Sequence, residues 1–148
     1  MAEKAAELNI PVGPWRKDFV NGQSVTLPDG RRIDAESVLG EYKPGTTLVT
    51  VGDTGNAMEL LPYVKGADAL SIESTYLEEE AEMAKQYSHH TAKMAAELAK
   101  AAGVGHLFLT HVSRRYREKD ILEEARSIFP ATEVARDFSQ FQVKHSEE

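Results

Sequence analysis

Three short apolar runs after residue 45 are each followed by an ionisable side chain. Asp53, Glu73 and His111 stand within two residues of the end of such a run, and His89 precedes a helix-like stretch. If the runs are parallel strands, their carboxyl ends meet at one edge of a sheet, where open α/β folds bind ligands. Each residue taken singly is more often a turn or a satisfied polar group, but together they indicate a functional site.

The residue types in this set suit metal-assisted hydrolysis. Carboxylate and imidazole groups bind Zn²⁺ or Mn²⁺, and one carboxylate can bridge two ions that share an activated hydroxide. Asp53 fits the bridging position and His111 fits a terminal ligand. Glu73 and His89 indicate a second task, because a carboxylate bound to one imidazole nitrogen leaves the other nitrogen to donate a proton. We therefore predict a metal centre with a general acid beside it.

Composition limits the alternatives. The chain has 148 residues, a size typical of one globular domain, and its 24 acidic and 17 basic residues give a formal charge of −7. This charge argues against binding nucleic acid by overall electrostatic attraction, so any RNA contact must be local. Cysteine is absent, which excludes disulfides and thiolate metal sites. The first residues are charged and no run approaches the roughly 20 apolar residues of a membrane span, so we expect a cytoplasmic protein.

Short apolar runs alternate with helix-like stretches after the Pro44-Gly45 break, which indicates βαβ units and a mainly parallel α/β sheet. The expected strands are residues 47–51, 69–72, 106–110 and 133–135. Expected helices cover 56–64, shortened or kinked by Pro62, then a helix from the N-cap Thr91 through Ala102 to Gly103, and one capped by Asp120.

The front of the chain looks different. A short helix is expected over residues 2–8, and residues 15–40 are rich in turns, with a hairpin made by 25–27 and 31–33 around a Pro-Asp-Gly turn. We expect no hydrophobic core of its own here. The chain is therefore interpreted as one domain, 1–148, with a turn-rich hairpin segment (1–45) and a βα core (46–148).

Several motifs in this order resemble ribonuclease Z of the metallo-β-lactamase superfamily. They are Val51-Gly52-Asp53-Thr54, Ile72-Glu73-Ser74-Thr75-Tyr76, His89-His90-Thr91-Ala92 and Leu109-Thr110-His111-Val112-Ser113-Arg114-Arg115-Tyr116. Upstream residues 9–14 and Asp29-Gly30 are also similar to the family. The resemblance covers nearly the whole chain but only the C-terminal half of the family's sequence.

This resemblance implies the C-terminal half of an αββα sandwich, with helices on one face of the sheet. Family members are tRNA 3′-end endonucleases that use two zinc ions. By the resemblance, Asp53 is the bridging ligand, His111 binds one metal, and Glu73 with His89 forms the proton-donating pair.

Basic residues beyond the last motif suggest an RNA contact. Arg114 and Arg115 are candidates for binding phosphate, although a solvated basic turn is an equally good interpretation. The family's His-Ser-Thr-Ala reads His89-His90-Thr91-Ala92 here, so either His89 or His90 is the acid.

The family's first metal motif, two His separated by one residue and followed by Asp-His, is absent from this sequence, as is a further His ligand before Asp53. Asp53 and His111 alone cannot assemble a dinuclear site. We therefore expect a chain that is inactive alone and that needs a complementary N-terminal half or a second copy of itself, with RNA as the substrate of the complete site.

Two other functions stay open on the sequence. The chain could be a non-catalytic relic of the fold that serves as a self-associating interaction module and binds no metal. It could also be a haloacid dehalogenase-like phosphatase, because Val51-Gly52-Asp53-Thr54-Gly55-Asn56 looks like that family's late magnesium motif. The phosphatase nucleophile motif is missing, which makes this the weakest hypothesis. Metal content and oligomeric state together separate the first two.

Overall fold

The computed structural model describes residues 2–40 and 45–145. The chain divides into two compact units, Met1–Pro44 and Gly45–Glu148, and each is described by itself. The break expected at Pro44-Gly45 falls at this division, and Pro44 lies outside the described residues. No helix within the described ranges is long and apolar enough to cross a membrane.

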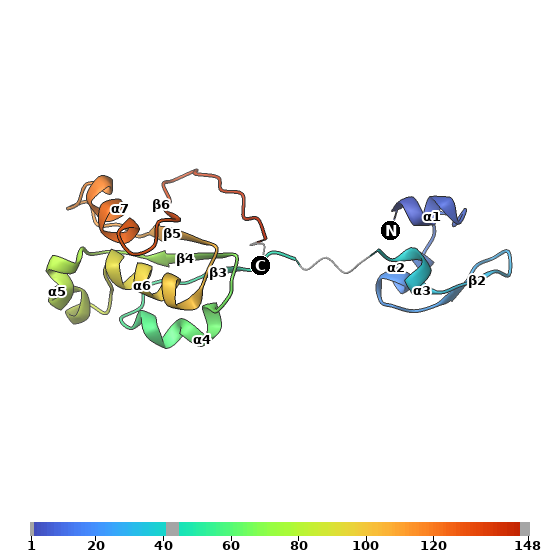
Figure 1. Ribbon diagram of the computed structural model, residues 1–148, viewed down its shortest axis with the longest axis horizontal. Coiled ribbons are helices and arrows are strands. Elements are labelled where there is room, and N and C mark those ends of the chain that lie inside the picture. The colour runs from blue at the N-terminus through green and yellow to red at the C-terminus, as the bar shows by residue number, and fades with distance from the viewer. Residues whose placement is uncertain (1, 41–44, 146–148) are drawn as a thin grey trace. The chain divides into compact units, whose positions relative to one another are not determined.

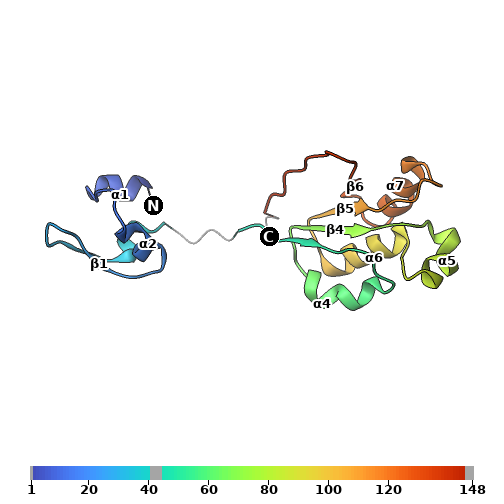
Figure 2. The same cartoon turned by 180° about the vertical axis from the view of Figure 1, so that it is seen from behind.

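The second unit is built on a four-stranded parallel sheet, seen from both sides in Figures 1 and 2. Its strands are β3 (Leu48–Thr50), β4 (Ala69–Glu73), β5 (His106–Thr110) and β6 (Thr132–Val134), in the order β3-β4-β5-β6. In the central pair, Ala69 lies opposite His106 and Glu73 opposite Thr110. The predicted α/β class with a mainly parallel sheet is confirmed. Strand β5 has the expected bounds, and the other strands differ from the expected ones by one residue at one or both ends.

Helices connect these strands. They are η1 (Ala57–Leu60), α4 (Leu61–Val64), η2 (Glu78–Glu80), α5 (Ala81–Gln86), α6 (Ala92–Ala102) and α7 (Glu118–Arg126). Helices α4, α6 and α7 pack against one face of the sheet (Figure 1). The main core forms there from fully buried side chains, among them Leu70, Ile72, Leu98, Leu107, Leu109 and Ile121. As in other α/β units, the core holds the strand ends in fixed positions.

Helix α6 matches the sequence prediction at both ends. The Thr91 hydroxyl accepts a hydrogen bond from the amide of Met94 at 3.1 Å, which satisfies one of the unpaired donors of the first turn. Gly103 ends the helix with φ of 64°, a left-handed conformation that glycine adopts without steric cost. Buried alanines such as Ala95 and Ala99 let this helix lie close to the sheet.

One helical prediction is confirmed and one needs correction. The stretch 56–64 is broken into η1 and α4, as expected from Pro62, which has no amide donor and fits only the first turn of a new helix. Helix α7 begins at Glu118 and is not capped by Asp120. The Asp120 carboxylate instead accepts two hydrogen bonds from the Arg117 guanidinium, at 2.8 and 2.9 Å, so it is engaged inside the first turn.

The first unit contains the predicted hairpin and more helix than expected. Its elements are α1 (Ala2–Glu7), α2 (Trp15–Val20), β1 (Val25–Thr26), β2 (Arg32–Ile33) and α3 (Ala35–Val38). Strands β1 and β2 pair antiparallel with Val25 opposite Ile33.

The expectation that this front segment has no core of its own is wrong. Phe19 is fully buried, and Ile10, Leu27 and Val38 surround it with exposures of 5% or less. These residues come from elements too short to show periodicity in the sequence, so their common burial was not visible there.

Candidate metal centre

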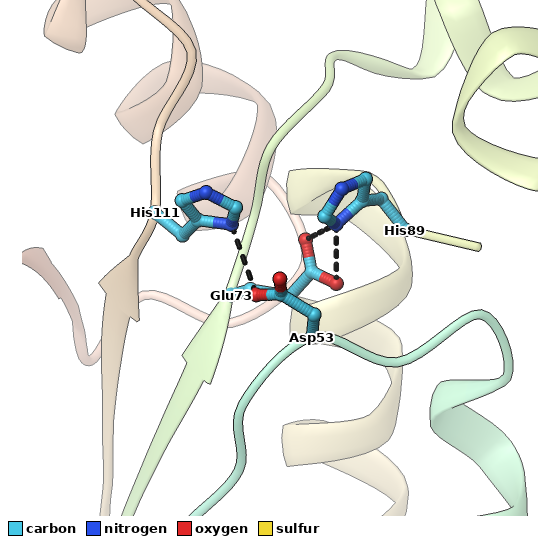
Figure 3. A group of neighbouring side chains, drawn as sticks. All are labelled: Asp53, Glu73, His89 and His111. Atoms are coloured by element: carbon cyan, nitrogen blue, oxygen red, sulfur yellow. Dashed lines mark hydrogen bonds and ion pairs between the residues drawn. The ribbon is translucent and has the colours of Figure 1, made fainter. Parts of the chain in front are cut away.

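The residues singled out in the sequence lie together at the carboxyl edge of the sheet. Asp53 is in the loop after β3, Glu73 ends β4, His111 follows β5 directly, and His89 stands just before α6. One ligand atom from each lies within 4.8 Å of those of the others. Figure 3 shows the four side chains gathered at this edge. The parallel order of the strands explains this convergence, because their carboxyl ends share one edge.

Glu73 is the buried centre of this cluster, with only 1% of its side chain exposed. Its oxygens accept hydrogen bonds from the Thr54 amide at 2.8 Å, the Thr75 hydroxyl at 2.5 Å and Nδ1 of His89 at 2.9 Å. Burial by itself raises the pKa of Glu73. The hydrogen bonds from Thr75, Thr54 and His89 outweigh it, so the pKa lies below its ordinary value of 4.5. Glu73 is therefore an anion at neutral pH.

The two adjacent histidines have different surroundings. His89 donates through Nδ1 to Glu73, which leaves Nε2 as its second nitrogen, and 18% of its side chain is exposed. His90 is fully buried, and its Nδ1 lies 2.9 Å from the carbonyl oxygen of Thr54. A carbonyl only accepts, so Nδ1 of His90 carries the proton in this bond. Of the two candidates for the acid, His89 is the one that reaches the surface, and its chemical role stays a prediction.

His111 and Asp53 form the open side of the cluster. Nδ1 of His111 lies 3.0 Å from Oδ1 of Asp53 and 3.2 Å from the Thr75 hydroxyl, and more than half of each side chain of the His111–Asp53 pair is exposed. The backbone of His111 has φ of 52°, in the left-handed region that few residues other than glycine adopt. Such conformations occur where a site requires a side chain to point in a set direction.

The two arginines predicted to contact RNA lie in the turn after His111. Arg115 is bound within the unit, because its guanidinium donates to Glu80 at 3.2 Å and contacts the sulfur of Met83. Arg114 is exposed and makes no side-chain hydrogen bond or ion pair with another residue in the described ranges. Arg114 is thus the better placed of the two for an anion.

Sequence reasoning missed the threonines that organise the cluster. Thr75 touches Glu73, His89 and His111 through one hydroxyl, at 2.5, 3.4 and 3.2 Å. The peptide group of Thr54 links two elements, because its amide donates to Glu73 while its carbonyl accepts from His90. The only signal for either residue was its place in a motif: Thr75 in Glu73-Ser74-Thr75 and Thr54 in Val51-Gly52-Asp53-Thr54.

The donor set fits a zinc ion. It offers two carboxylates and two imidazoles, the hard-to-borderline ligands that zinc binds in hydrolases. Asp53 and His111 are largely exposed, and so is the ion pair between them. They can therefore turn towards an ion, whereas Glu73 is held by three donors. The residues thus divide into an open pair, Asp53 and His111, suited to coordination, and a second pair in which the buried Glu73 orients the imidazole of His89.

The sequence of this chain is similar to that of curated ribonuclease Z proteins. Curated ribonuclease Z from Bradyrhizobium sp. (strain ORS 278) is 48% identical over 143 residues, which are 97% of this chain and 48% of that protein. The ribonuclease Z of Brevibacillus brevis is 42% identical, covering 96% of this chain and 47% of that protein. The chain therefore spans about half the length of the curated relatives it matches. No family model matches the chain.

Solved structures agree on the fold. The metallo-β-lactamase fold protein YhfI from Bacillus subtilis matches with a TM-score of 0.58 and 25% identity, over 62% of this chain and 37% of that one. The short form of human tRNase Z matches with a TM-score of 0.54 and 23% identity, over 76% and 37%. The chain is a homologue of ribonuclease Z that spans about half the length of its curated relatives and carries part of the metallo-β-lactamase fold.

Proposed function

We propose that this chain is the C-terminal, metal-binding half of a zinc-dependent endoribonuclease of the ribonuclease Z type, acting on the 3′ ends of tRNA precursors. The observation that carries the proposal is the convergence of Asp53, Glu73, His89 and His111 within 4.8 Å. The names of the relatives support RNA as the substrate, the name of human tRNase Z supports tRNA, and the 3′ end is what the resemblance to ribonuclease Z implies.

Asp53 and His111 would hold the metal. Both lie in loops at the exposed edge of the sheet, and their ligand atoms are 3.0 Å apart. Zinc, when bound, acts as a Lewis acid and activates water for attack on a phosphodiester. Asp53 is the candidate for a bridging carboxylate, because more than half of its side chain is exposed, whereas Glu73 is buried.

Glu73 and His89 would act together as the general acid that protonates the leaving group. Because the Glu73 carboxylate binds Nδ1 of His89, it fixes the tautomer and the orientation of the ring. The remaining nitrogen can then give a proton to the ribose oxygen that leaves. Arg114, exposed just beyond His111, is the candidate for a phosphate contact.

The complete dinuclear site needs ligands that this sequence lacks. Neither a pair of His one residue apart followed by Asp-His nor any His before position 89 occurs in it. We propose that a complementary half, in the cytoplasm, supplies them. The alternative is a non-catalytic, self-associating member of the fold that binds no metal, and zinc binding and oligomeric state together separate the two.

Zinc binding by the isolated chain tests the proposal by calorimetric titration of the metal-free protein with Zn²⁺. We expect one ion to bind, and the double substitution Asp53→Asn with His111→Asn to weaken the affinity at least about tenfold. His106→Asn is the matched control, because His106 forms a similar ion pair with Glu133, at 3.0 Å, at the opposite end of β5. A wild-type chain that takes up no zinc, or a double variant that binds as tightly, would refute the proposal.

A further inference from the structure

Two loops of the candidate metal centre touch through their backbones at Gly55. Gly55 follows Thr54 in the loop after β3, and Ser88 precedes His89 in the turn between α5 and α6. A Cβ atom added at position 55 would lie 3.2 Å from Cα of Ser88, and 3.5 Å from both its carbonyl carbon and its Cβ. Carbon atoms in optimal contact are about 3.5–4.0 Å apart. The two loops can lie this close because residue 55 has no side chain.

Ser88 is held in place by the end of α5. Its amide donates to the carbonyl of Lys85 at 3.2 Å, and the amide of His89 donates to the carbonyl of Ala84 at 2.8 Å. These two bonds, with Ser88 at φ of 58°, form the Schellman motif that ends many helices. A serine in the left-handed region has little room to change its backbone angles. Ser88 therefore cannot move away from Gly55 without carrying the backbone of His89 with it.

The loop after β3 is held just as firmly beside Gly55. The amide of Thr54 donates to Glu73 at 2.8 Å, and the carbonyl oxygen of Thr54 lies 2.9 Å from Nδ1 of His90. Both partners are buried, with exposures of 1% or less. A displacement of Gly55 would therefore pass to the adjoining Thr54, and from its amide to the carboxylate of Glu73.

Neither side of the contact can yield without disturbing the hydrogen bond between Glu73 and His89. Nδ1 of His89 lies 2.9 Å from Oε2 of Glu73, and in Figure 3 the ring faces this carboxylate. We propose that Gly55 is a positioning residue, whose missing side chain lets the two loops meet at the separation where Glu73 holds the Nδ1–H form of His89. The inference rests on the proposed function, because the proton-donating role is what gives this tautomer its use.

Alanine at position 55 tests the contact through space alone. The φ angle of Gly55 lies outside the left-handed region, so alanine adds no backbone strain there. Gly52→Ala is the matched control. Gly52 lies in the same loop, its φ is also outside that region, and an added Cβ meets no atom within 4 Å. Both variants restrict the unfolded chain equally. Only Gly55→Ala sets a Cβ against Ser88.

The tautomer of His89 is the quantity to measure, by NMR of the imidazole nitrogens in the metal-free chain at a pH where the ring is neutral. We expect the Nδ1–H form alone in the wild type and in Gly52→Ala. Gly55→Ala should lose this single form and show exchange with the Nε2–H form, because the added Cβ shifts the ring or its acceptor by a few tenths of an ångström. An unchanged spectrum of His89 in Gly55→Ala would overturn the inference.

A second variant assigns the effect to Ser88. Combining Gly55→Ala with Ser88→Gly removes the Cβ that lies 3.5 Å from the added atom and frees the backbone of the turn. The double variant should recover the Nδ1–H form, and a double variant that matches Gly55→Ala would also overturn the inference. All variants should stay folded by circular dichroism, since residues 55 and 88 are exposed. The spectra need neither zinc nor RNA, so this test and the zinc titration can fail independently of each other.

Discussion

Glu73→Gln is the substitution that tests most directly how the site is built. The change keeps the shape of the side chain and removes its charge. In the native cluster, two carboxylate oxygens accept from Thr54, Thr75 and His89. The glutamine side chain has one acceptor oxygen in place of two. Its NH2 group takes the place of the second oxygen and directs hydrogens at a group that is itself a hydrogen-bond donor. The Thr75 hydroxyl can rotate to accept, but the amide of Thr54 and the ring of His89 must then share one uncharged oxygen.

The expected cost follows from these contacts. Hydrogen bonds to a charged group contribute about 1.5–3 kcal/mol each, so losing one at a site with 1% exposure should lower the free energy of unfolding by about 2–3 kcal/mol. The assay is urea unfolding of metal-free protein at neutral pH, with EDTA present, so that metal affinity does not enter. Glu79→Gln is the control, because Glu79 is exposed and should change stability by less than about 0.5 kcal/mol.

Acid should remove the difference between the two proteins. The pKa of Glu73 in the folded chain lies below 4.5, so its carboxylate stabilises the native state above that pH. This contribution is lost as the pH falls through the lowered pKa, where the protonated side chain resembles glutamine. The gap between wild type and Glu73→Gln should therefore be constant near neutrality and shrink in acid. Equal stability of the two at neutral pH would show that the carboxylate does not hold the cluster together.

Two further substitutions probe the supports of the site. His90→Leu removes the donor to the Thr54 carbonyl and should speed the amide hydrogen exchange of Thr54, measured by NMR. His90→Asn should restore slow exchange, because its side-chain amide can replace Nδ1 as the donor. The same exchange rate in the wild type and both variants would contradict the positioning role of His90. Gly103→Ala should cost about 1 kcal/mol in urea unfolding, since an added Cβ meets no atom within 4 Å and only the left-handed backbone opposes it. A neutral effect of Gly103→Ala would mean that the helix end relaxes.

Much of the second unit could be predicted because its signals are local. Strand β5 and helix α6 were predicted with their observed bounds, since one is a short apolar run and the other has both a threonine cap and a C-terminal glycine. The convergence of Asp53, Glu73 and His111 followed from the rule that parallel strands share a carboxyl edge. Local sequence and one topological rule were sufficient for these features.

The remaining features depend on contacts between distant residues. The core around Phe19 joins side chains from five short elements, none of which shows a periodic pattern. Asp120 looked like a helix cap, but Arg117, three residues earlier, binds its carboxylate. The hydrogen bonds of Thr54 and Thr75 depend on side-chain geometry that no spacing in the sequence encodes.

The left-handed backbone at His111 restricts how this position can change by mutation. Valine or isoleucine at position 111 would remove the imidazole and would also strain the turn, because β-branched side chains are poorly accommodated at positive φ. Asparagine, aspartate and glycine tolerate that conformation best. A lineage that loses the histidine without damaging the fold should thus pass through one of these three residues, and two of them keep an oxygen at the edge of the sheet.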